Sequence, residues 1–543
     1  MTASQRHQIL DVLQWMGFAI VLAALPFSNF FMSFGSFWMV GAWLLNLLNA
    51  HYSGEDVRVF FKPFLSDRSY IAISAIYFLP LLGLLWSSEF GFAGWDLRMK
   101  LPILFMPFLV ATMRPMGPKM LESLMWVFIS ALLIAVFFCF RVYLGHTSHK
   151  VRNFRDISIF ISHIRFSILL VFGIIVLSIS AYRKGVLPWR EAAIASLFLG
   201  FLWIMESITA VIMLFVWAAI VVFRYVFAHP KKWISAVVVV LSLSVLIGGI
   251  YYVHNAYRNY FSAEPIDISK LDAFTSRGER YEHFPENTLL ENGNYILLYL
   301  AWGELKQSWE SRSTIPIDSL DKKGNPIKGT LARYLTSKGL RKDADGMAQL
   351  TDDEIRLIEE GTTSYCSKDK RGLNKRLDRI FFELDNYRNG GSPNGHSVFQ
   401  RLEFWKTGLT IYHEHPILGV GTGDLKSSFK EMYVRQNSKL EEGNRLRAHQ
   451  QYLTMFITYG TVGGLIFLGL VLYPFFKKSN RGNVIFMSFG LLFLISCLTE
   501  DTLETQAGVM FFAFFSSFLV RYFPSIHLAA GETLGDLIQN EKQ

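Results

Sequence analysis

Cysteine and charge are both scarce in this chain. The three cysteines, Cys139, Cys366 and Cys497, lie far apart, and two of them fall in apolar segments, so we expect neither a disulfide framework nor a metal cluster. Only 18% of the 543 residues are charged, whereas 51% are hydrophobic. An ordinary soluble protein is more polar than this. These shortages exclude a disulfide-stabilised secreted protein, and they indicate that lipid is the solvent for much of the chain.

Apolar stretches long enough to cross a bilayer recur from residue 12 to near the end of the sequence. A hydrocarbon core about 30 Å thick needs roughly 20 apolar residues per helix. We expect about twelve transmembrane helices, near 12–30, 33–51, 69–88, 101–113, 120–142, 166–182, 191–206, 208–227, 233–253, 451–474, 483–499 and 506–521. The first apolar run leads into the second without a small-residue cleavage pattern, so the N-terminus is predicted to be that of the mature protein. The predicted fold class is an all-α polytopic membrane protein.

Positive charge predicts the orientation of these spans, because cytoplasmic loops are rich in Lys and Arg. With the N-terminus inside, the predicted inner loops hold such pairs as Arg114 with Lys119 and Lys477 with Lys478. Most of the formal charge of +9 lies in such loops, so nucleic acid is not an expected partner. We predict a membrane bundle at 1–253, one outer domain at 254–450, about three further spans at 451–522 and a cytoplasmic tail at 523–543.

The outer domain is predicted to be mainly helical. Thr351 has the character of a helix cap, since acidic residues and helix-period apolar residues follow it. The segment 389–395, which reads Asn-Gly-Gly-Ser-Pro-Asn-Gly, predicts a turn-rich break. A new helix is expected to begin near Ser397.

Three predicted outer loops carry cations against the orientation rule. The first holds Lys150, Arg152, Arg155 and Arg165, the second Arg98 and Lys100, and the third Arg445, Arg447 and His449. Guanidinium groups bind phosphate oxygens in bidentate fashion, so these clusters suit a diphosphate at headgroup depth. Each residue alone could instead anchor a helix at ordinary membrane lipids. The three clusters together favour the ligand.

The segment that enters the tenth predicted span contains a recognisable motif. It reads Arg447-Ala-His449-Gln450, and nine residues later Gly460-Thr-Val-Gly463 follows. Upstream stand Gln400-Arg401-Leu-Glu-Phe-Trp405, His415-Pro416-Ile-Leu-Gly419-Val-Gly421-Thr-Gly423-Asp424 and Arg165-Phe-Ser-Ile-Leu169. In these motifs and in its layout of spans, the chain resembles the O-antigen ligase and polymerase family. It departs from the family at Glu206-Ser207, where many members have Ser-Arg.

The resemblance implies glycan transfer from an undecaprenyl diphosphate carrier to an acceptor hydroxyl, at the periplasmic face of the inner membrane. Ligases of the family use lipid A core as acceptor, polymerases use a second carrier-linked glycan, and some relatives glycosylate proteins. The motifs are shared, so the choice between ligase, exopolysaccharide polymerase and protein O-glycosylation ligase stays open. No metal or other cofactor is expected. A transporter of lipid-linked sugars is the alternative from another class, although the two halves of the chain do not match as inverted repeats would.

The expected chemistry is direct displacement at the sugar C1 with inversion. His449 is the candidate base, because a neutral imidazole takes up a proton readily near neutral pH. Arg165 and Arg401 are the first candidates to stabilise the leaving diphosphate. Arg98, Arg445 and Arg447 come next. The alternative for His449 is an interfacial residue that caps the start of a helix.

Two further groups have open roles. Glu500, Asp501 and Glu504 fall at an outer helix corner, where they could form a solvated cap or orient an Arg or His of the site. Gly460 and Gly463 are one helical turn apart and are predicted to let the tenth span pack closely on a neighbour. The Gly-rich run 419–423 lacks a preceding strand, so it predicts a tight turn rather than a nucleotide site.

Overall fold

The computed structural model describes residues 3–147, 154–183, 188–228, 232–365 and 373–523. Helices make up 72% of the chain, which confirms the predicted all-α class. Within the described ranges the only sheet is a two-stranded antiparallel hairpin, β1 (Leu290–Glu291) and β2 (Asn294–Tyr295). The chain divides into two compact units. Unit 1 comprises Met1–Pro230, Phe404–Ser438 and Arg445–Gln543, and unit 2 comprises Lys231–Glu403 and Lys439–Asn444.

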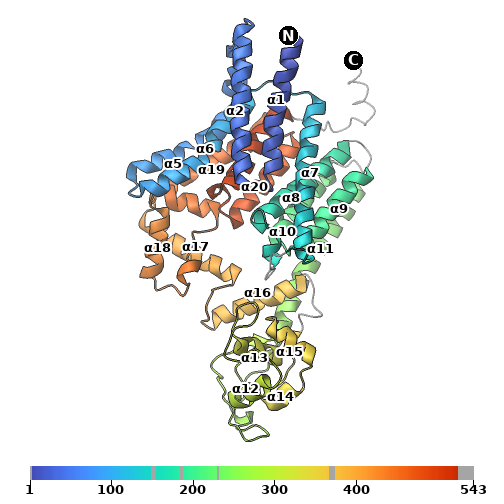
Figure 1. Cartoon of the computed structure of the whole chain (residues 1–543), viewed down its shortest axis with the longest axis vertical. Coiled ribbons are helices and arrows are strands. Elements are labelled where there is room, and N and C mark those ends of the chain that lie inside the picture. The colour runs from blue at the N-terminus through green and yellow to red at the C-terminus, as the bar shows by residue number, and fades with distance from the viewer. Residues whose placement is uncertain (1–2, 148–153, 184–187, 229–231, 366–372, 524–543) are drawn as a thin grey trace. The chain divides into compact units, whose positions relative to one another are not determined.

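Unit 1 contains most of the apolar helices (Figure 1). They are α1 (Ala3–Ala24), α2 (Asn29–Tyr52), α3 (Arg58–Ser66), α4 (Arg68–Ala75), α5 (Phe78–Leu82), α6 (Phe90–Thr112), α7 (Pro118–Tyr143), α8 (His163–Arg183), α9 (Trp189–Ile204), α10 (Ile208–Ala228), α18 (Leu425–Arg435), α19 (Gln451–Phe476), α20 (Val484–Thr499) and α21 (Gln506–Tyr522). Short 3-10 turns are η1 (Gly83–Trp86), η2 (Phe154–Ile157), η6 (Lys478–Asn480) and η7 (Thr502–Glu504). The helix α17 (Ser397–Glu414) begins in unit 2 and ends in unit 1.

Seven helical segments in the described ranges are long and apolar enough to cross a membrane. They are Ser4–Ala24, Asn29–Tyr52, Arg68–Trp86, Pro118–Tyr143, His163–Ala181, Trp233–Tyr260 and Gln451–Phe476, and the shorter apolar helices are Ile208–Arg224, Val484–Thr499 and Gln506–Tyr522. The protein is therefore a multi-pass membrane protein, as predicted. Every range predicted as a span contains helix, but the count of twelve crossings stays a prediction.

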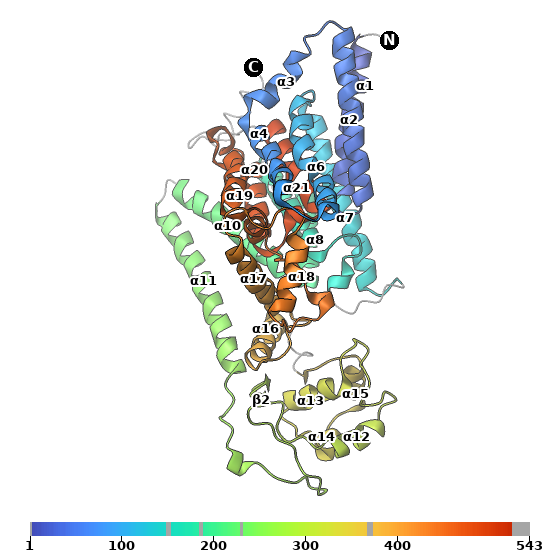
Figure 2. The ribbon, with the colours of Figure 1, turned by 90° about the vertical axis from the view of Figure 1, so that its left-hand side faces the viewer.

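The helix α21 lies at the centre of unit 1 and is buried along most of its length. It packs against α6, α20, α2 and α4, and Figure 2 shows it surrounded by these elements. Aromatic side chains fill the space: the ring centroid of Phe515 lies 4.7 Å from that of Phe172 on α8, and that of Phe512 lies 4.3 Å from that of Phe493 on α20. This aromatic packing fixes the ends of α20 and α21, and therefore the turn between them.

One predicted boundary is wrong. The fourth span was expected at 101–113 after a charged outer loop, but α6 begins at Phe90, so Arg98 and Lys100 lie inside a helix. The reason is pairing: Lys100 donates hydrogen bonds to Asp96 one turn earlier (2.9 Å) and to Glu504 (2.7 Å). Paired charges are tolerated in a bundle where a lone charge is not. Hydropathy alone predicts a loop here, because Asp96, Arg98 and Lys100 are all charged.

Residues Gly419 and Gly460 bring two chain segments into backbone contact. The helix α19 is interrupted at Gly460, which has φ +64°, and a Cβ there would lie 2.1 Å from the Ile417 carbonyl oxygen. A Cβ on Gly419 would lie 2.5 Å from the Gly460 nitrogen. Across this contact the Gly421 N–H donates to the Thr458 carbonyl (2.9 Å). The predicted turn at 419–423 therefore packs against α19 at Gly460, the glycine that was predicted to allow close packing. The helix is broken at this residue.

Unit 2 consists of a long apolar helix and a smaller domain of short helices joined by irregular segments. Its elements are α11 (Lys232–Tyr260), η3 (Ile268–Lys270), α12 (Trp302–Glu310), α13 (Ile327–Ser337), α14 (Ala344–Ala348), α15 (Asp352–Glu359), α16 (Leu373–Arg388), η5 (Glu442–Asn444) and the hairpin. Figure 2 shows α12 to α15 gathered around one core, in which Trp309 and Tyr334 are fully buried. The predicted cap is confirmed: Thr351 and Glu354 form a capping box at the start of α15. The helix predicted near Ser397 is α17, which begins at that residue.

Several predictions fall outside the described residues. These are the cations Lys150 and Arg152, the thiol Cys366 and the tail 523–543 beyond its first residue.

Candidate functional site

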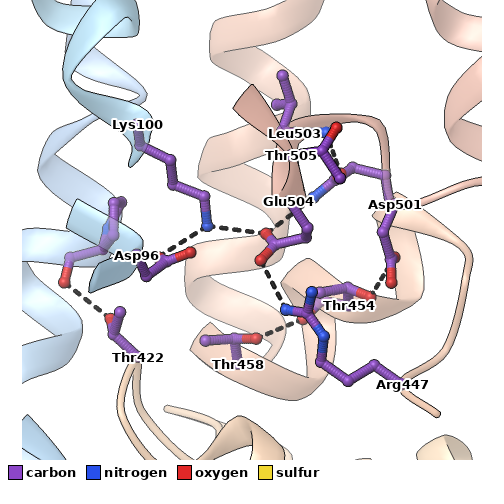
Figure 3. A network of polar contacts seen from close by, with 12 residues as sticks. Asp96, Lys100, Thr422, Arg447, Thr454, Thr458, Asp501, Leu503, Glu504 and Thr505 are labelled. Atoms are coloured by element: carbon purple, nitrogen blue, oxygen red, sulfur yellow. Dashed lines mark hydrogen bonds and ion pairs between the residues drawn. The ribbon is translucent and has the colours of Figure 1, made fainter. Parts of the chain in front are cut away.

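A buried polar cluster lies where the segment before α19 meets the turn between α20 and α21 (Figure 3). We call residues 500–504 the acidic turn, because it contains Glu500, Asp501 and Glu504. These side chains are 7%, 6% and 3% exposed, so of the two alternatives for this corner the solvated cap is wrong. Buried carboxylates are stable only when they are hydrogen-bonded or paired. Their partners therefore define the site.

Asp501 holds the backbone on both sides of the predicted base. Its Oδ2 accepts from the His449 N–H (3.1 Å), and its Oδ1 accepts from the Gln450 N–H (3.0 Å) and from the Thr454 hydroxyl (2.7 Å). His449 has φ +48°, in the left-handed region that residues other than Gly rarely adopt. Such strain persists only where the surroundings hold it. The three bonds to one carboxylate provide that restraint.

The His449 side chain is also flanked. Its Nδ1 lies 3.6 Å from Oε2 of Glu500, and its ring lies 5.7 Å from that of Phe404. The preceding residue is anchored as well, since the Trp405 indole N–H donates to the Ala448 carbonyl (3.0 Å). The imidazole is 33% exposed. It can therefore meet a molecule from solvent while a carboxylate beside it stabilises the imidazolium that proton uptake would form.

The start of α19 excludes the alternative role of His449 as its cap. Gln450 is the N-cap residue, and its side chain accepts from the Leu453 N–H. Gln451 follows inside the helix and is fully buried. Its side-chain oxygen accepts from the Leu503 N–H (2.7 Å), which joins the helix start to the acidic turn a second time. His449 thus lies just before the helix, and its side chain does not accept from the backbone N–H groups at the helix start.

A chain of ion pairs runs inward from the same turn. Arg447 donates to Oε2 of Glu504 (2.8 Å), and Lys100 donates to Oε1 of the same carboxylate (2.7 Å) and to Asp96. Burial opposes the ionisation of Glu504, but Lys100 and Arg447 outweigh it and hold the pKa of Glu504 below its ordinary value. Burial raises the pKa of Asp501, and the charge of Arg447 opposes that rise. Glu504 is therefore the carboxylate of the cluster whose ionised form is stabilised by two cations.

Arg165, at the start of α8, is the predicted diphosphate-binding residue that approaches this site in the described part of unit 1. It is half-buried and lies within electrostatic reach of both Glu500 and Asp501. Since Glu500 also flanks His449, the acidic turn connects the predicted base with a predicted phosphate-binding cation. The motif residues from 165 and 449 are thus brought to one corner of the bundle.

The other predicted cations lie elsewhere or have structural partners. Arg98 is exposed and lies two residues from Asp96 and from Lys100, on the opposite face of α6. Arg447 is half-buried and bound to Glu504, so part of its guanidinium already has a partner. Arg445 is half-buried.

Arg401 lies on α17 in unit 2 and is also half-buried. Its participation with His449 stays a prediction.

Two residues of the cluster, Asp96 and Thr454, were not predicted as part of the site. Lys100 was expected among the cations of an outer loop, but it pairs with Asp96 at the spacing of four that is typical of a helical ion pair. Thr454 carried no signal, because its partner Asp501 is 47 residues away in the sequence. A contact of this kind depends on how α19, α20 and α21 pack.

Comparison with known proteins places the part of this site around His449 in a recognised family segment. Residues 370–468 match the family model described as O-antigen ligase, which confirms the family resemblance over that range. The range contains the glycine contact, His449 and the start of α19. An uncharacterized protein of Haemophilus influenzae is 27% identical over 134 residues, and this alignment covers 24% of the present chain. The chain thus spans about a third (33%) of the length of the curated relative that it matches.

Proposed function

We propose that this protein is a membrane glycosyltransferase of the O-antigen ligase type, which moves a glycan from an undecaprenyl diphosphate carrier to an acceptor hydroxyl. One observation carries the proposal: within the family-matched segment, a strained and partly exposed histidine is held by two buried carboxylates. A surface histidine without a chemical task has no need of such restraint. Strained backbone of this kind clusters at functional sites.

In the proposed reaction His449 is the base. The acceptor hydroxyl attacks the sugar C1 and gives its proton to the imidazole, while the bond from C1 to the phosphate oxygen breaks and its electron pair leaves with the diphosphate. The new glycosidic bond forms on the opposite face of C1, so the configuration inverts. Glu500 stabilises the imidazolium, and solvent later removes its proton. Proton transfer of this type contributes roughly 10²–10⁴ in rate.

Negative charge grows on the diphosphate as it leaves, and fixed cations lower the barrier by meeting it. Arg165 is supported by its position near the acidic turn. Arg401, Arg98 and Arg445 are further candidates for this task. For Arg447 its bond to Glu504 favours a positioning role, in which it aligns the segment that carries His449.

The proposal places the site at the periplasmic face of the bacterial inner membrane, with both termini in the cytoplasm. Residues 254–450 then form the periplasmic domain. The proposed acceptor is lipid A core. A polymerase would use a second carrier-linked glycan instead, and a protein glycosylation ligase would use a protein hydroxyl at the same site.

The test is a transfer assay with purified protein in lipid. A labelled undecaprenyl diphosphate glycan is offered with lipid A core, with a second carrier-linked glycan, or with an acceptor protein, without added nucleotide. Label that moves to lipid A core supports the ligase, and label in longer carrier-linked chains supports the polymerase. Movement of intact donor across the bilayer without any transfer would identify a transporter and refute the proposal.

His449→Ala is the decisive variant. We expect transfer to be lost while membrane insertion and abundance stay normal, because the imidazole is one-third (33%) exposed and its backbone N–H bond to Asp501 does not need the side chain. His413→Ala, which removes an exposed histidine from the last turn of α17, is the matched control and should retain activity. Normal transfer by His449→Ala protein would remove the imidazole from the mechanism.

A further inference from the structure

The second unit contains an open pocket of about 250 Å³ that no part of the proposed chemistry uses. One wall is the end of α11, where Tyr252, Asn255 and Asn259 follow one another at helical spacings of three and four. The facing wall is the start of α16, which contributes Asn374 and Asp378. The hairpin turn closes the pocket with Glu291 and Asn292. All of these residues belong to unit 2.

The chemistry of this lining is that of a polyol site. Each Asn amide offers one acceptor oxygen and two donor hydrogens, which matches the paired hydroxyl groups of a sugar ring. Among the described residues, the amides of Asn255 and Asn259 have no hydrogen-bonded partner, and both residues are exposed. Tyr252 and Tyr260 add aromatic surface with a polar end, which suits the mixed faces of a pyranose.

The charges of the described lining residues favour a neutral ligand over an anionic one. Of the described residues that line the pocket, none is Lys or Arg, whereas Glu291 and Asp378 are acidic. The nearby cation Arg333 is already bound to Glu291, with distances of 2.9 Å and 2.8 Å from its two guanidinium nitrogens. Among the described lining residues a phosphate would therefore meet two carboxylates and no lysine or arginine. A neutral sugar meets acceptors for its hydroxyl hydrogens.

The pocket is also built rather than accidental. Glu291 is 7% exposed and fixed by Arg333, and the Tyr260 hydroxyl donates to the Leu290 carbonyl (2.8 Å). The Asn292 side chain donates to the Ser337 carbonyl (3.0 Å), which holds the hairpin turn in place. The Tyr252 hydroxyl donates to the side-chain oxygen of Asn374, across the opening between α11 and α16.

The length of α11 places the pocket near the membrane surface. The helix has 29 residues, which at 1.5 Å per residue corresponds to about 43 Å. A hydrocarbon core of about 30 Å uses roughly the first 20 of them. The last turns, which carry Tyr252 to Tyr260, then extend beyond the hydrocarbon into the headgroup layer. Sugars attached to a lipid carrier lie at this depth.

We propose that the groove between α11 and α16 binds a neutral sugar unit of the lipid-linked glycan, as a saccharide subsite separate from the reacting centre. The assignment of that sugar to the glycan rests on the proposed function, but its chemical class rests on the lining alone. A site at this depth would hold the chain of sugars while its reducing end is transferred. It would also make the protein selective for the glycan.

The test uses the full-length protein in lipid nanodiscs and measures binding rather than transfer. The probes are glucose, galactose, N-acetylglucosamine and their disaccharides, and saturation-transfer NMR reports contact with the sugar protons. At least one probe should bind to the wild type. The double substitution Asn255→Ala with Asn259→Ala should weaken it about tenfold, because it removes several hydrogen bonds. Ala256→Trp, which fills the groove without removing a polar group, should abolish binding.

Controls separate this inference from the proposed function. Gln307→Ala removes an exposed amide on α12, outside the pocket, and should bind sugar normally. His449→Ala should also bind sugar normally, even though transfer is expected to be lost. Sugar binding that depends on Asn255 in a protein without transferase activity would support the pocket and refute the proposed function.

Other outcomes overturn the inference itself. Transfer with no effect of Ala256→Trp on binding or on glycan selectivity would refute the pocket alone. Binding of inorganic phosphate or of phosphatidylglycerol vesicles at these residues, in place of neutral sugars, would identify an anion site instead.

Discussion

Replacement of Asp501 by Asn tests whether the acidic turn positions the proposed base. Asp501 accepts three hydrogen bonds, from the His449 N–H, the Gln450 N–H and the Thr454 hydroxyl. An Asn side chain has one acceptor oxygen, and its NH₂ group would face a donor. At least one of the three donors then loses its partner. If the Asn oxygen takes the place of Oδ1, His449 is the donor that loses the contact holding its positive φ.

The size of the effect follows from these bonds. A hydrogen bond to a charged group contributes about 1.5–3 kcal/mol. If that energy serves alignment of His449, then kcat should fall by roughly tenfold to a hundredfold, since about 1.4 kcal/mol corresponds to a factor of ten. KM for the glycan donor should change little, because Asp501 is buried and does not meet substrate.

The assay is steady-state transfer by the Asp501→Asn protein, together with its thermal unfolding in the same lipid. Thr454→Ser, which keeps the hydroxyl that donates to Asp501, is the matched control. A purely structural role would lower abundance and the unfolding temperature while the surviving protein kept its kcat. Wild-type kcat in stable Asp501→Asn protein would therefore refute the positioning argument.

Three further outcomes are expected. Gly460→Ala should lower the unfolding temperature and the abundance, because the left-handed φ alone costs an alanine about 1–3 kcal/mol. Gly469→Ala is the control and should be tolerated, because a Cβ at Gly469 would meet no neighbour within 4 Å. Lys100→Met should destabilise the protein by about 3–5 kcal/mol in thermal unfolding, because it leaves buried carboxylates without their cation. Burial opposes the ionisation of Glu354, but Lys338 and the helix cap lower its pKa, so its contribution to stability is present above its ordinary pKa and lost as pH falls. Glu354→Gln should flatten that loss below about pH 5 when unfolding is followed by Trp fluorescence.

Local sequence signals predicted most of the helical fold. Hydropathy located helix in each range expected to span the membrane, and the Thr351 cap and the start near Ser397 were confirmed. The error at α6 has a clear origin. Residues Asp96, Arg98 and Lys100 look like a loop to any method that scores charge, because the partner that makes Lys100 acceptable, Glu504, is 404 residues away.

The sequence predicted the motif residues of the candidate site but not the residues that hold them in place. His449 and Arg165 are identified by family motifs, and the structure brings both near the acidic turn. The roles of the three carboxylates of that turn could not be predicted, since the same sequence could form a solvated helix cap or a buried set of hydrogen-bond acceptors. Only the packing of α20 against α21 decides between them. Asn255 and Asn259 belong to no sequence motif. Their proposed role depends on α16, which forms the facing wall of the pocket.

The break in α19 has a consequence for assembly in the membrane. Peptide groups that cannot bond within a helix are costly in hydrocarbon, and here the Ile457 carbonyl and the Thr461 N–H bond instead to Val420 (3.0 Å) and Pro416 (2.7 Å). This helix therefore depends for its backbone bonding on a stretch of chain some forty residues earlier in the sequence, and the loop and the helix complete each other's backbone hydrogen bonds.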